Sequence, residues 1–269
     1  MSEAMDWREI QLGDGQWMKR KFGQIWLFVL SARHEWRVAQ VPSAVAEKLP
    51  DHGVLSDLTE RFNWQRWNRC AEDTQIHFRP AYPTLPVVAR PRDAFFLSPQ
   101  GRTDFYVGIP ACVDVLGGCN GKMMKLCSFS TENLTKTWHG TTHHGNLAYA
   151  LRTEARRDLA AEPFVLHEII FKVEISNNGK VHLPFERLYV ETQHLAIFDN
   201  GRQLWGNAAR IHIDPENHSA SNITYAANPS ADAGDVTQLT APREGRKRSS
   251  VFRSSLARVI DQFDLFQEI

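Results

Sequence analysis

Hydrophobic and polar positions along this chain alternate mostly with the two-residue period of β-strands. Near the N-terminus the pattern predicts two strands, Gln24 to Ser31 and His34 to Val41, joined into a hairpin at Ala32-Arg33. Asp14-Gly15, shortly after Ile10 to Leu12, predicts an earlier hairpin turn, because glycine accepts the positive φ that tight turns require. We therefore expect an N-terminal region built of β-hairpins.

One stretch of the N-terminal region has helical spacing instead. Apolar residues from Val54 to Phe62 recur three or four positions apart, and Ser56-Asp57 offers side chains that can cap a helix. This pattern predicts one short helix near residues 54–67.

Prolines divide the next region into short segments with strand-like composition, and a missing backbone N–H does little harm between strands. The predicted strands are Gln75 to Arg79, Pro86 to Arg90, Ala94 to Leu97, Asp104 to Ile109, Lys122 to Ser130 and Asn146 to Thr153.

The clearest alternation runs from Val165 to Ile175 and predicts a strand with Ile169, Phe171 and Val173 near a core. Asn177-Asn178-Gly179 then predicts a type I′ hairpin turn into the next strand. Asp199-Asn200-Gly201 predicts another turn after Leu195 to Phe198.

Short strands with frequent turns are typical of sandwiches and barrels. We therefore predict an all-β protein with β-sandwich-type sheets. The polar stretch 156–163 is the best internal boundary, so three regions are expected. They are an N-terminal hairpin region with the short helix over 1–73, a first sandwich portion over 74–155, and a second sandwich portion with a C-terminal helix over 164–269.

The C-terminal segment has a different pattern. Its apolar residues step by four, three, four and three, which predicts an amphipathic helix through Phe252, Leu256, Val259, Phe263 and Phe266. A basic stretch from Arg243 to Arg248 directly precedes it. Three roles are open for this helix: packing on its own sheet, docking to an unknown protein partner, or binding anionic lipid.

Composition excludes some classes of function. Lysine plus arginine equals aspartate plus glutamate at 31 each, so the basic excess of a dedicated nucleic-acid binder is missing. No apolar run approaches the ~18 residues that span a bilayer, and the first twelve residues lack the apolar centre of a signal peptide. We expect a cytoplasmic protein without a transmembrane segment, whose four cysteines are reduced.

Metal and cofactor chemistry find little support in the sequence. His139, His143 and His144 lie close together, but the glycines around them favour a loop over the helix on which paired histidines share a metal. The spacing of Cys112, Cys119 and Cys127 is not that of a zinc knuckle. We predict no cofactor and no metal site, with the three histidines as weak metal candidates.

Motifs for catalysis are also missing. The sequence contains no G-x-S-x-G elbow, no H-E-x-x-H and no phosphate-binding glycine loop. Carboxylates such as Glu168 and Glu174 are available for acid–base chemistry, although solvent-facing glutamates on strands are commonplace. Eight tryptophans allow a carbohydrate-binding surface, but tryptophan also commonly fills cores.

Three stretches together are similar to a known family. The run Leu134 to Gly140 followed by Gly145 to Leu151 is similar to the pattern S-K-x-W/Y-x-G and G-x-x-C-Y/R, and Asp104 to Pro110 is a second matching stretch. The third runs from Pro184 to Trp205. They resemble the uncharacterised prokaryotic family named domain of unknown function 432.

The resemblance covers roughly residues 75 to 260 in the same order. It implies an all-β intracellular protein without an established activity. The family's association with genes for small mechanosensitive-type channels implies a membrane channel as a partner. This chain departs from the pattern at Ala148, where cysteine is frequent, and at His139, where an aromatic residue is more usual.

We therefore expect a non-enzymatic intracellular binding or accessory module. Its ligand-binding candidates are Trp138, His139, Tyr149 and Arg152, with Trp138 packed inward to anchor its loop and Gly140 and Gly145 letting the backbone bend. The alternative is a hydrolase-type enzyme that uses the loop around Trp138 to His144. A cleft lined by His139, Tyr149 and Arg152 would favour the enzyme.

Overall fold

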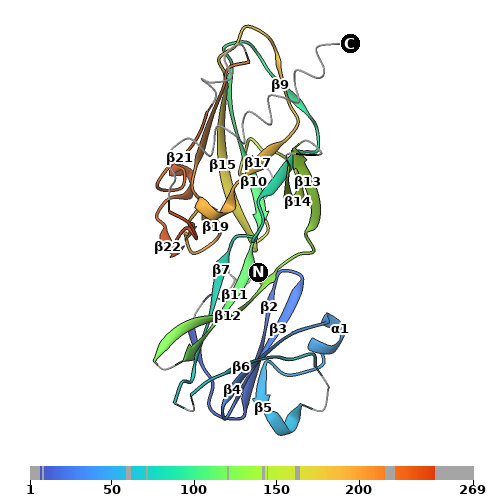
Figure 1. The fold of residues 1–269 in the computed structure, drawn as a ribbon, viewed down its shortest axis with the longest axis vertical. Coiled ribbons are helices and arrows are strands. Elements are labelled where there is room, and N and C mark those ends of the chain that lie inside the picture. Colours follow the sequence, from blue (N-terminus) through green and yellow to red (C-terminus); the bar gives the residue numbers. More distant parts are fainter. Residues whose placement is uncertain are drawn as a thin grey trace. The chain divides into compact units, whose positions relative to one another are not determined.

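The structure is a computed structural model that describes residues 7, 9–58, 62–70, 72–119, 121–140, 143, 145–160, 164–215 and 222–245. The chain folds into two compact units, and each unit is built from two separated segments (Figure 1). Unit 1 comprises Met1–Ala81 and Pro110–Asn133, and unit 2 comprises Tyr82–Ile109 and Leu134–Ile269. The three consecutive regions proposed from the sequence do not coincide with these units, because the chain enters unit 2 and returns to unit 1 before its second passage.

Unit 1 contains a five-stranded and a four-stranded sheet. The five-stranded order is β5 (His52–Val54), β2 (Gln16–Phe22), β3 (Ile25–Ala32), β4 (Glu35–Val41) and β6 (Gln65–Asn68). The four-stranded order is β1 (Glu9–Gln11), β7 (Gln75–Ala81), β11 (Cys112–Cys119) and β12 (Lys122–Ser130). Phe22 of the first sheet and Phe78 of the second have ring centroids 5.0 Å apart in the shared core. The predicted β3–β4 hairpin is confirmed by its antiparallel register.

A second core lies on the opposite face of the five-stranded sheet. Trp17 and Phe28 are fully buried there and stack with ring centroids 5.5 Å apart. The short helix α1 (Ser43–Ala46), which the sequence analysis missed, supplies Ala46 to this cluster. Lys19 on β2 donates hydrogen bonds to the carbonyls of Ala46 and Leu49, so a buried ammonium ties the helix and the segment after it to the sheet.

Of the short helix predicted near residues 54–67, the described residues of that range contain one 3₁₀ turn, η1 (Leu55–Asp57). The following chain includes β6, which pairs with β4. The helical spacing misled because Val54 and Leu55 are exposed, whereas Leu58 and Phe62 pack on the Trp17–Phe28 cluster. The pairing of β6 with β4 therefore overrides the local helical pattern.

Unit 2 contains three sheets. The largest has the order β21 (Asn222–Tyr225), β20 (Ala209–Ile213), β15 (Glu168–Asn177), β19 (Leu204–Gly206), β18 (Ile197–Asp199) and β22 (Thr237–Thr240), with β10 (Arg102–Pro110) also pairing with β15. The second has the order β13 (Thr135–Gly140), β14 (Gly145–Thr153), β8 (Val87–Pro91) and β17 (Leu188–Val190). The third pairs β9 (Phe95–Leu97) with β16 (Leu183–Phe185), and short 3₁₀ turns occur at η2 (Thr192–His194) and η4 (Ala231–Ala233).

The predicted strand Val165 to Ile175 is confirmed from Glu168 onward as β15, which continues to Asn177. Ile169, Phe171 and Val173 are all fully buried, as the alternation predicts. Val165 lies before the strand and is 48% exposed, so the regular pattern begins a few residues earlier than the strand itself.

The predicted type I′ turn at Asn177-Asn178-Gly179 is wrong. β15 pairs in parallel with β19 and β20, and the next strand, β16, pairs with β9 instead. The buried amide of Asn177 organises this corner: its Nδ2 donates to the carbonyls of Leu97, Ser98 and Val181, and its Oδ1 accepts from the Gly179 N–H. The turn at Asp199-Asn200-Gly201 is confirmed, since it joins the antiparallel strands β18 and β19 and Gly201 has φ of 80°.

The fold is thus an all-β, sandwich-type architecture, as predicted. The predicted C-terminal amphipathic helix lies outside the described residues. Among the residues that are described, no helix has the length and apolar character required to cross a membrane.

Candidate functional site

The hairpin β13–β14 carries the candidate residues of the sequence analysis. Residues that pair across neighbouring strands share one face of the sheet. Trp138 pairs with Leu147 and Tyr149 with Lys136, which places Trp138 and Tyr149 on one face. His139 pairs with Asn146, and the alternation along β14 places Arg152 with them on the other face. The four candidates are therefore divided between two faces and do not line one cleft.

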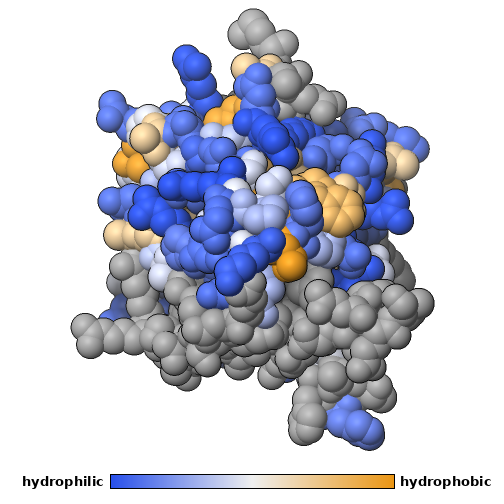
Figure 2. All heavy atoms as spheres, turned by 90° about the horizontal axis from the view of Figure 1, so that it is seen from above, coloured by the Kyte–Doolittle hydropathy of each residue, from blue (hydrophilic) through white to orange (hydrophobic). Residues whose placement is uncertain are grey.

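Trp138 does not pack inward as predicted, because it lies on a strand and is 53% exposed. Its indole covers Gly145 across the hairpin: a Cβ at Gly145 would lie 2.3 Å from the Trp138 Nε1. Gly140 has φ of 113°, so it has the backbone role predicted for it, whereas Gly145 makes room for the indole on a regular strand. On the side of the molecule that Figure 2 shows, hydrophobic residues form separate spots on a mostly hydrophilic surface.

In contrast to the neighbouring Trp138, His139 is buried, with 2% of its surface exposed. Its imidazole stacks on Tyr189 of β17, with ring centroids 4.5 Å apart and planes inclined by 14°. The Tyr189 hydroxyl accepts a hydrogen bond of 3.3 Å from the Asn146 amide. These contacts link β13, β14 and β17 on one face of their sheet.

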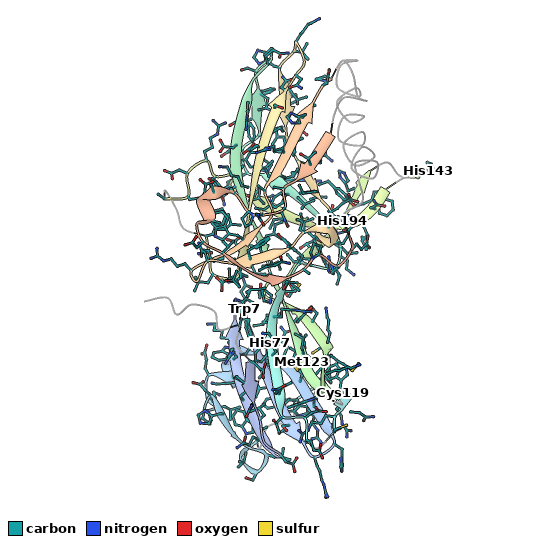
Figure 3. All side chains as sticks on the ribbon, turned by 90° about the vertical axis from the view of Figure 1, so that its left-hand side faces the viewer. Trp7, His77, Cys119, Met123, His143 and His194 are labelled. Carbon is teal, nitrogen blue, oxygen red and sulfur yellow. The ribbon has the colours of Figure 1, made fainter. Side chains whose placement is uncertain are left out.

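The histidine cluster is only partly described. His143 is exposed beyond the end of the hairpin, whereas His194 lies at a separate place in unit 2 (Figure 3). His144 lies outside the described residues. Over the described ranges, no three His, Cys, Asp or Glu residues are grouped so that they could hold a metal ion.

Three arginines lie side by side on the face that carries His139 and Tyr189, which we call the arginine face. Arg152 of β14 and Arg90 of β8 are register partners. Leu188 of β17 pairs with Ala89 in the antiparallel direction, so Arg187, directly before Leu188, lies next to Arg90. Neighbouring strands are about 4.8 Å apart, so the three guanidinium groups start from adjacent positions in one row across the sheet.

The row concentrates positive charge. Burial and the neighbouring charge of Arg90 lower the pKa of Arg187, and Glu186 offsets this only in part. Glu186 lies 3.9 Å from Arg187, at the limit of an ion pair. Arg90 and Arg152 are exposed, and no ion pair joins either of them to an acidic side chain within the described part of the chain. Like charges on neighbouring strands are destabilising, so this arrangement is unfavourable by itself.

Charges elsewhere in unit 2 are neutralised locally. Lys172 of β15 contacts Asp104 at 3.2 Å and Asp232 at 2.7 Å. Burial alone would lower the pKa of Lys172, but these hydrogen bonds outweigh it and raise the pKa. The hydrogen bond from Lys172 is also the main cause of the lowered pKa of Asp232. The arginine face differs from this cluster, because among the described residues Arg90 and Arg152 have no ion pair and Arg187 has only the 3.9 Å contact with Glu186.

A shallow pocket of about 290 Å³ lies on the β10–β15–β20 side of unit 2. Its Glu174 pairs with Arg102 at 2.7 Å and with Arg210 at 2.9 Å. Beside them, the Ser176 Oγ lies 2.6 Å from the His212 Nδ1. A serine–histidine contact is one part of a Ser-His-Asp catalytic triad, in which a carboxylate orients the histidine. Here the Glu174 carboxylate is held by the two arginines and does not orient His212.

Sequence reasoning found Arg152 and His139 but missed Arg90, Arg187 and Tyr189. Each of these lies on a different strand from the hairpin, and which distant strands pair is not readable from local alternation. The one clue in the sequence was Arg90 at the end of the strand predicted over Pro86 to Arg90, two positions after Val88 and therefore on the same face of that strand.

The fold and the arginine face together define the class of protein: an all-β, sandwich-type protein with a basic face on one sheet. The chain belongs to the family described as Protein of unknown function (DUF432), whose model matches residues 6–260, as the resemblance indicated. Comparison with curated proteins and with solved structures gave no match.

Proposed function

We propose that the protein is a non-enzymatic, cytoplasmic binding module that uses its arginine face to hold an acidic segment of a partner protein. The observation that carries the proposal is the row of Arg90, Arg152 and Arg187 on three neighbouring strands. Guanidinium groups bind carboxylates through paired, charge-assisted hydrogen bonds. Carboxylates from a partner would relieve the repulsion that the row carries in the free protein.

The division of the sequence candidates between two faces also favours binding over catalysis. A hydrolase based on the Trp138 to His144 region needs converging groups, and Trp138 and Tyr149 face away from His139 and Arg152. Binding to a row of arginines needs no such convergence. The membrane channel implied by the family resemblance is the first partner to test, through an acidic segment outside the membrane.

The binding test uses a ten-residue poly-glutamate peptide as the acidic probe. We expect measurable binding by isothermal titration calorimetry at low salt, and at least a tenfold weaker affinity in an Arg90→Gln/Arg152→Gln variant, since hydrogen bonds to charged groups contribute about 1.5–3 kcal/mol each. Raising the salt concentration is expected to weaken the wild-type affinity.

The matched control is an Arg33→Gln/Arg202→Gln variant, which removes the same charge from two exposed turn positions. Its affinity for poly-glutamate should stay within about twofold of the wild type. Equal losses in both variants would mean that net charge, not the arginine face, attracts the probe. Absence of binding to the wild-type protein would refute the proposal.

The row of three arginines should also lower the free energy of unfolding of the protein without a bound partner. We expect Arg90→Gln to raise the free energy of unfolding by a few tenths of a kcal/mol at low salt, because it removes a like charge beside Arg187. The gain should shrink as added salt screens the repulsion. Urea denaturation at two salt concentrations measures this, and a stability loss at low salt would contradict the interpretation.

A further inference from the structure

The shallow pocket between β10, β15 and β20 brings together polar groups from three strands. Because β20 pairs in parallel with β15, Arg210 lies beside Glu174, and His212 lies beside Ser176. Residues two apart on a strand share a face, so these four side chains form two rows on one face of the sheet. Arg102 of β10 reaches Glu174 from the other side of β15. Two arginines, a serine and a histidine thus surround one carboxylate.

The two arginines keep most of their hydrogen-bond donors available. Both contact the same carboxylate atom, the Glu174 Oε2: Arg102 donates through a terminal nitrogen at 2.7 Å, and Arg210 donates through its Nε at 2.9 Å. Each guanidinium group has further N–H donors, and among the described residues neither arginine has a second acidic partner. The arginine side chains are 68% and 66% exposed, whereas that of Glu174 is only 22% exposed. A largely buried carboxylate therefore holds both guanidinium groups in place while their remaining donors stay accessible.

The charge balance of the pocket favours an anion. Its lining residues include two arginines and one carboxylate, so the lining has a net positive charge. Two residues earlier on the same face of β15 the balance is reversed, because one cation, Lys172, contacts the carboxylates of Asp104 and Asp232. The Ser176 Oγ and the His212 Nδ1, 2.6 Å apart, lie at the end of the pocket away from Lys172. An anion between the arginines and this pair would have hydrogen-bonding groups on two sides.

We propose that this pocket binds a phosphoryl group, with Arg102 and Arg210 as its main contacts and Ser176 and His212 at its end. Guanidinium groups bind phosphate oxygens through paired, charge-assisted hydrogen bonds. A tetrahedral phosphoryl group can meet donors from three strands at once, whereas a planar carboxylate offers fewer oxygens. The cavity volume of about 290 Å³ lies at the small end of the range for ligand pockets, roughly 300–1,000 Å³, which suits a small phosphate compound. The pocket belongs to a different sheet from the arginine face, so it does not depend on the proposed function.

A phosphate titration followed by NMR tests the pocket directly. Full-length, ¹⁵N-labelled protein is titrated with sodium phosphate at about pH 7.5, and sodium chloride keeps the ionic strength constant. We expect saturable shifts of the backbone amides of residues 174–176 and 210–212. In an Arg102→Gln/Arg210→Gln variant the phosphate affinity should fall by at least about tenfold. Absence of saturable shifts at these amides in the wild type, or an unchanged affinity in the variant, would overturn the proposal.

Two further variants separate the pocket from folding and from general charge. Arg102→Lys/Arg210→Lys keeps a cation on each side of Glu174 but removes the paired donors, so its phosphate affinity should fall by at least about threefold. This variant decides the question if the glutamine variant does not fold, and an affinity equal to that of the wild type would count against the guanidinium contacts. Arg90→Gln/Arg152→Gln removes the same charge from the arginine face and should stay within about twofold of the wild type at the pocket amides. An equal loss in this control would mean that net charge alone attracts phosphate.

Three phosphate compounds identify what carries the phosphoryl group. Inorganic phosphate and glycerol 3-phosphate both present free terminal oxygens, whereas dimethyl phosphate has two blocked oxygens and a single negative charge. Tighter binding of glycerol 3-phosphate than of inorganic phosphate would identify a phosphate ester as the ligand, and equal or weaker binding would identify the free anion. Dimethyl phosphate should bind at least about tenfold more weakly than the better of the two. Equal binding of all three compounds would overturn a pocket that recognises a terminal phosphoryl group.

Discussion

Replacement of Phe171 by alanine is expected to lower the free energy of unfolding by about 3–5 kcal/mol, the usual cost of removing a buried phenylalanine. The ring is fully buried in the middle of β15. It packs near Tyr225, with ring centroids 6.1 Å apart, and against Gly206 of the neighbouring strand β19. A cavity at this point would loosen the sheet that also carries β10, β19 and β20. Urea denaturation monitored by circular dichroism measures the change.

The matched control is Val165→Ala, in the same stretch of alternating residues. Val165 is 48% exposed, so its truncation should change the free energy of unfolding by less than about 0.5 kcal/mol. A Phe171→Ala variant as stable as Val165→Ala would show that β15 does not lie at the core of unit 2.

The contrast between these two residues shows what alternation can predict. The two-residue period of burial identified β15, because one face of the strand is buried throughout, whereas the other face, apart from Ile170, is only partly buried. The same pattern did not reveal its partners: β15 pairs in parallel with β19 and β20, which are separated from it by three and four intervening strands along the chain. Parallel pairing over such distances depends on the packing of the whole unit.

Only part of the candidate site could be predicted, because local sequence does not show which distant strands pair. Arg152 and His139 belong to a hairpin that local sequence defines, but Arg90 and Arg187 reach the same face through pairing of β8 with β14 and β17. The prediction of a loop around Trp138 failed because Gly145 suggested flexibility, whereas it makes room for the indole across a regular hairpin. Glycine is ambiguous in sequence, since it permits both turns and close contacts.

A second large effect is expected at Asn177, the residue that the sequence analysis assigned to a hairpin turn. Its side chain is fully buried, and its Nδ2 faces the carbonyls of Leu97, Ser98 and Val181. In Asn177→Asp, a carboxylate oxygen would face these three carbonyl oxygens without any donor. Each buried acceptor left unpaired costs about 1–3 kcal/mol, so we expect a loss of roughly 3–5 kcal/mol near neutral pH.

The loss should depend on pH with a definite sign. Burial among carbonyl oxygens disfavours the charged form, so the pKa of the new carboxyl group is raised in the folded protein above its unfolded value of about 3.9. The folded state then holds a proton that the unfolded state releases, and stability falls as the pH rises above about 4. Asn177→Asp should thus be closest in stability to the wild type at low pH, where the protonated acid can still donate one hydrogen bond.

Asn178→Asp, at the exposed neighbouring position, makes the same chemical change without burial and should remain within about 0.5 kcal/mol of the wild type. Urea denaturation of the three proteins at pH 4.5 and pH 7.5 measures these differences, and a penalty for Asn177→Asp that did not grow with pH would show that its side chain is not enclosed by those carbonyls.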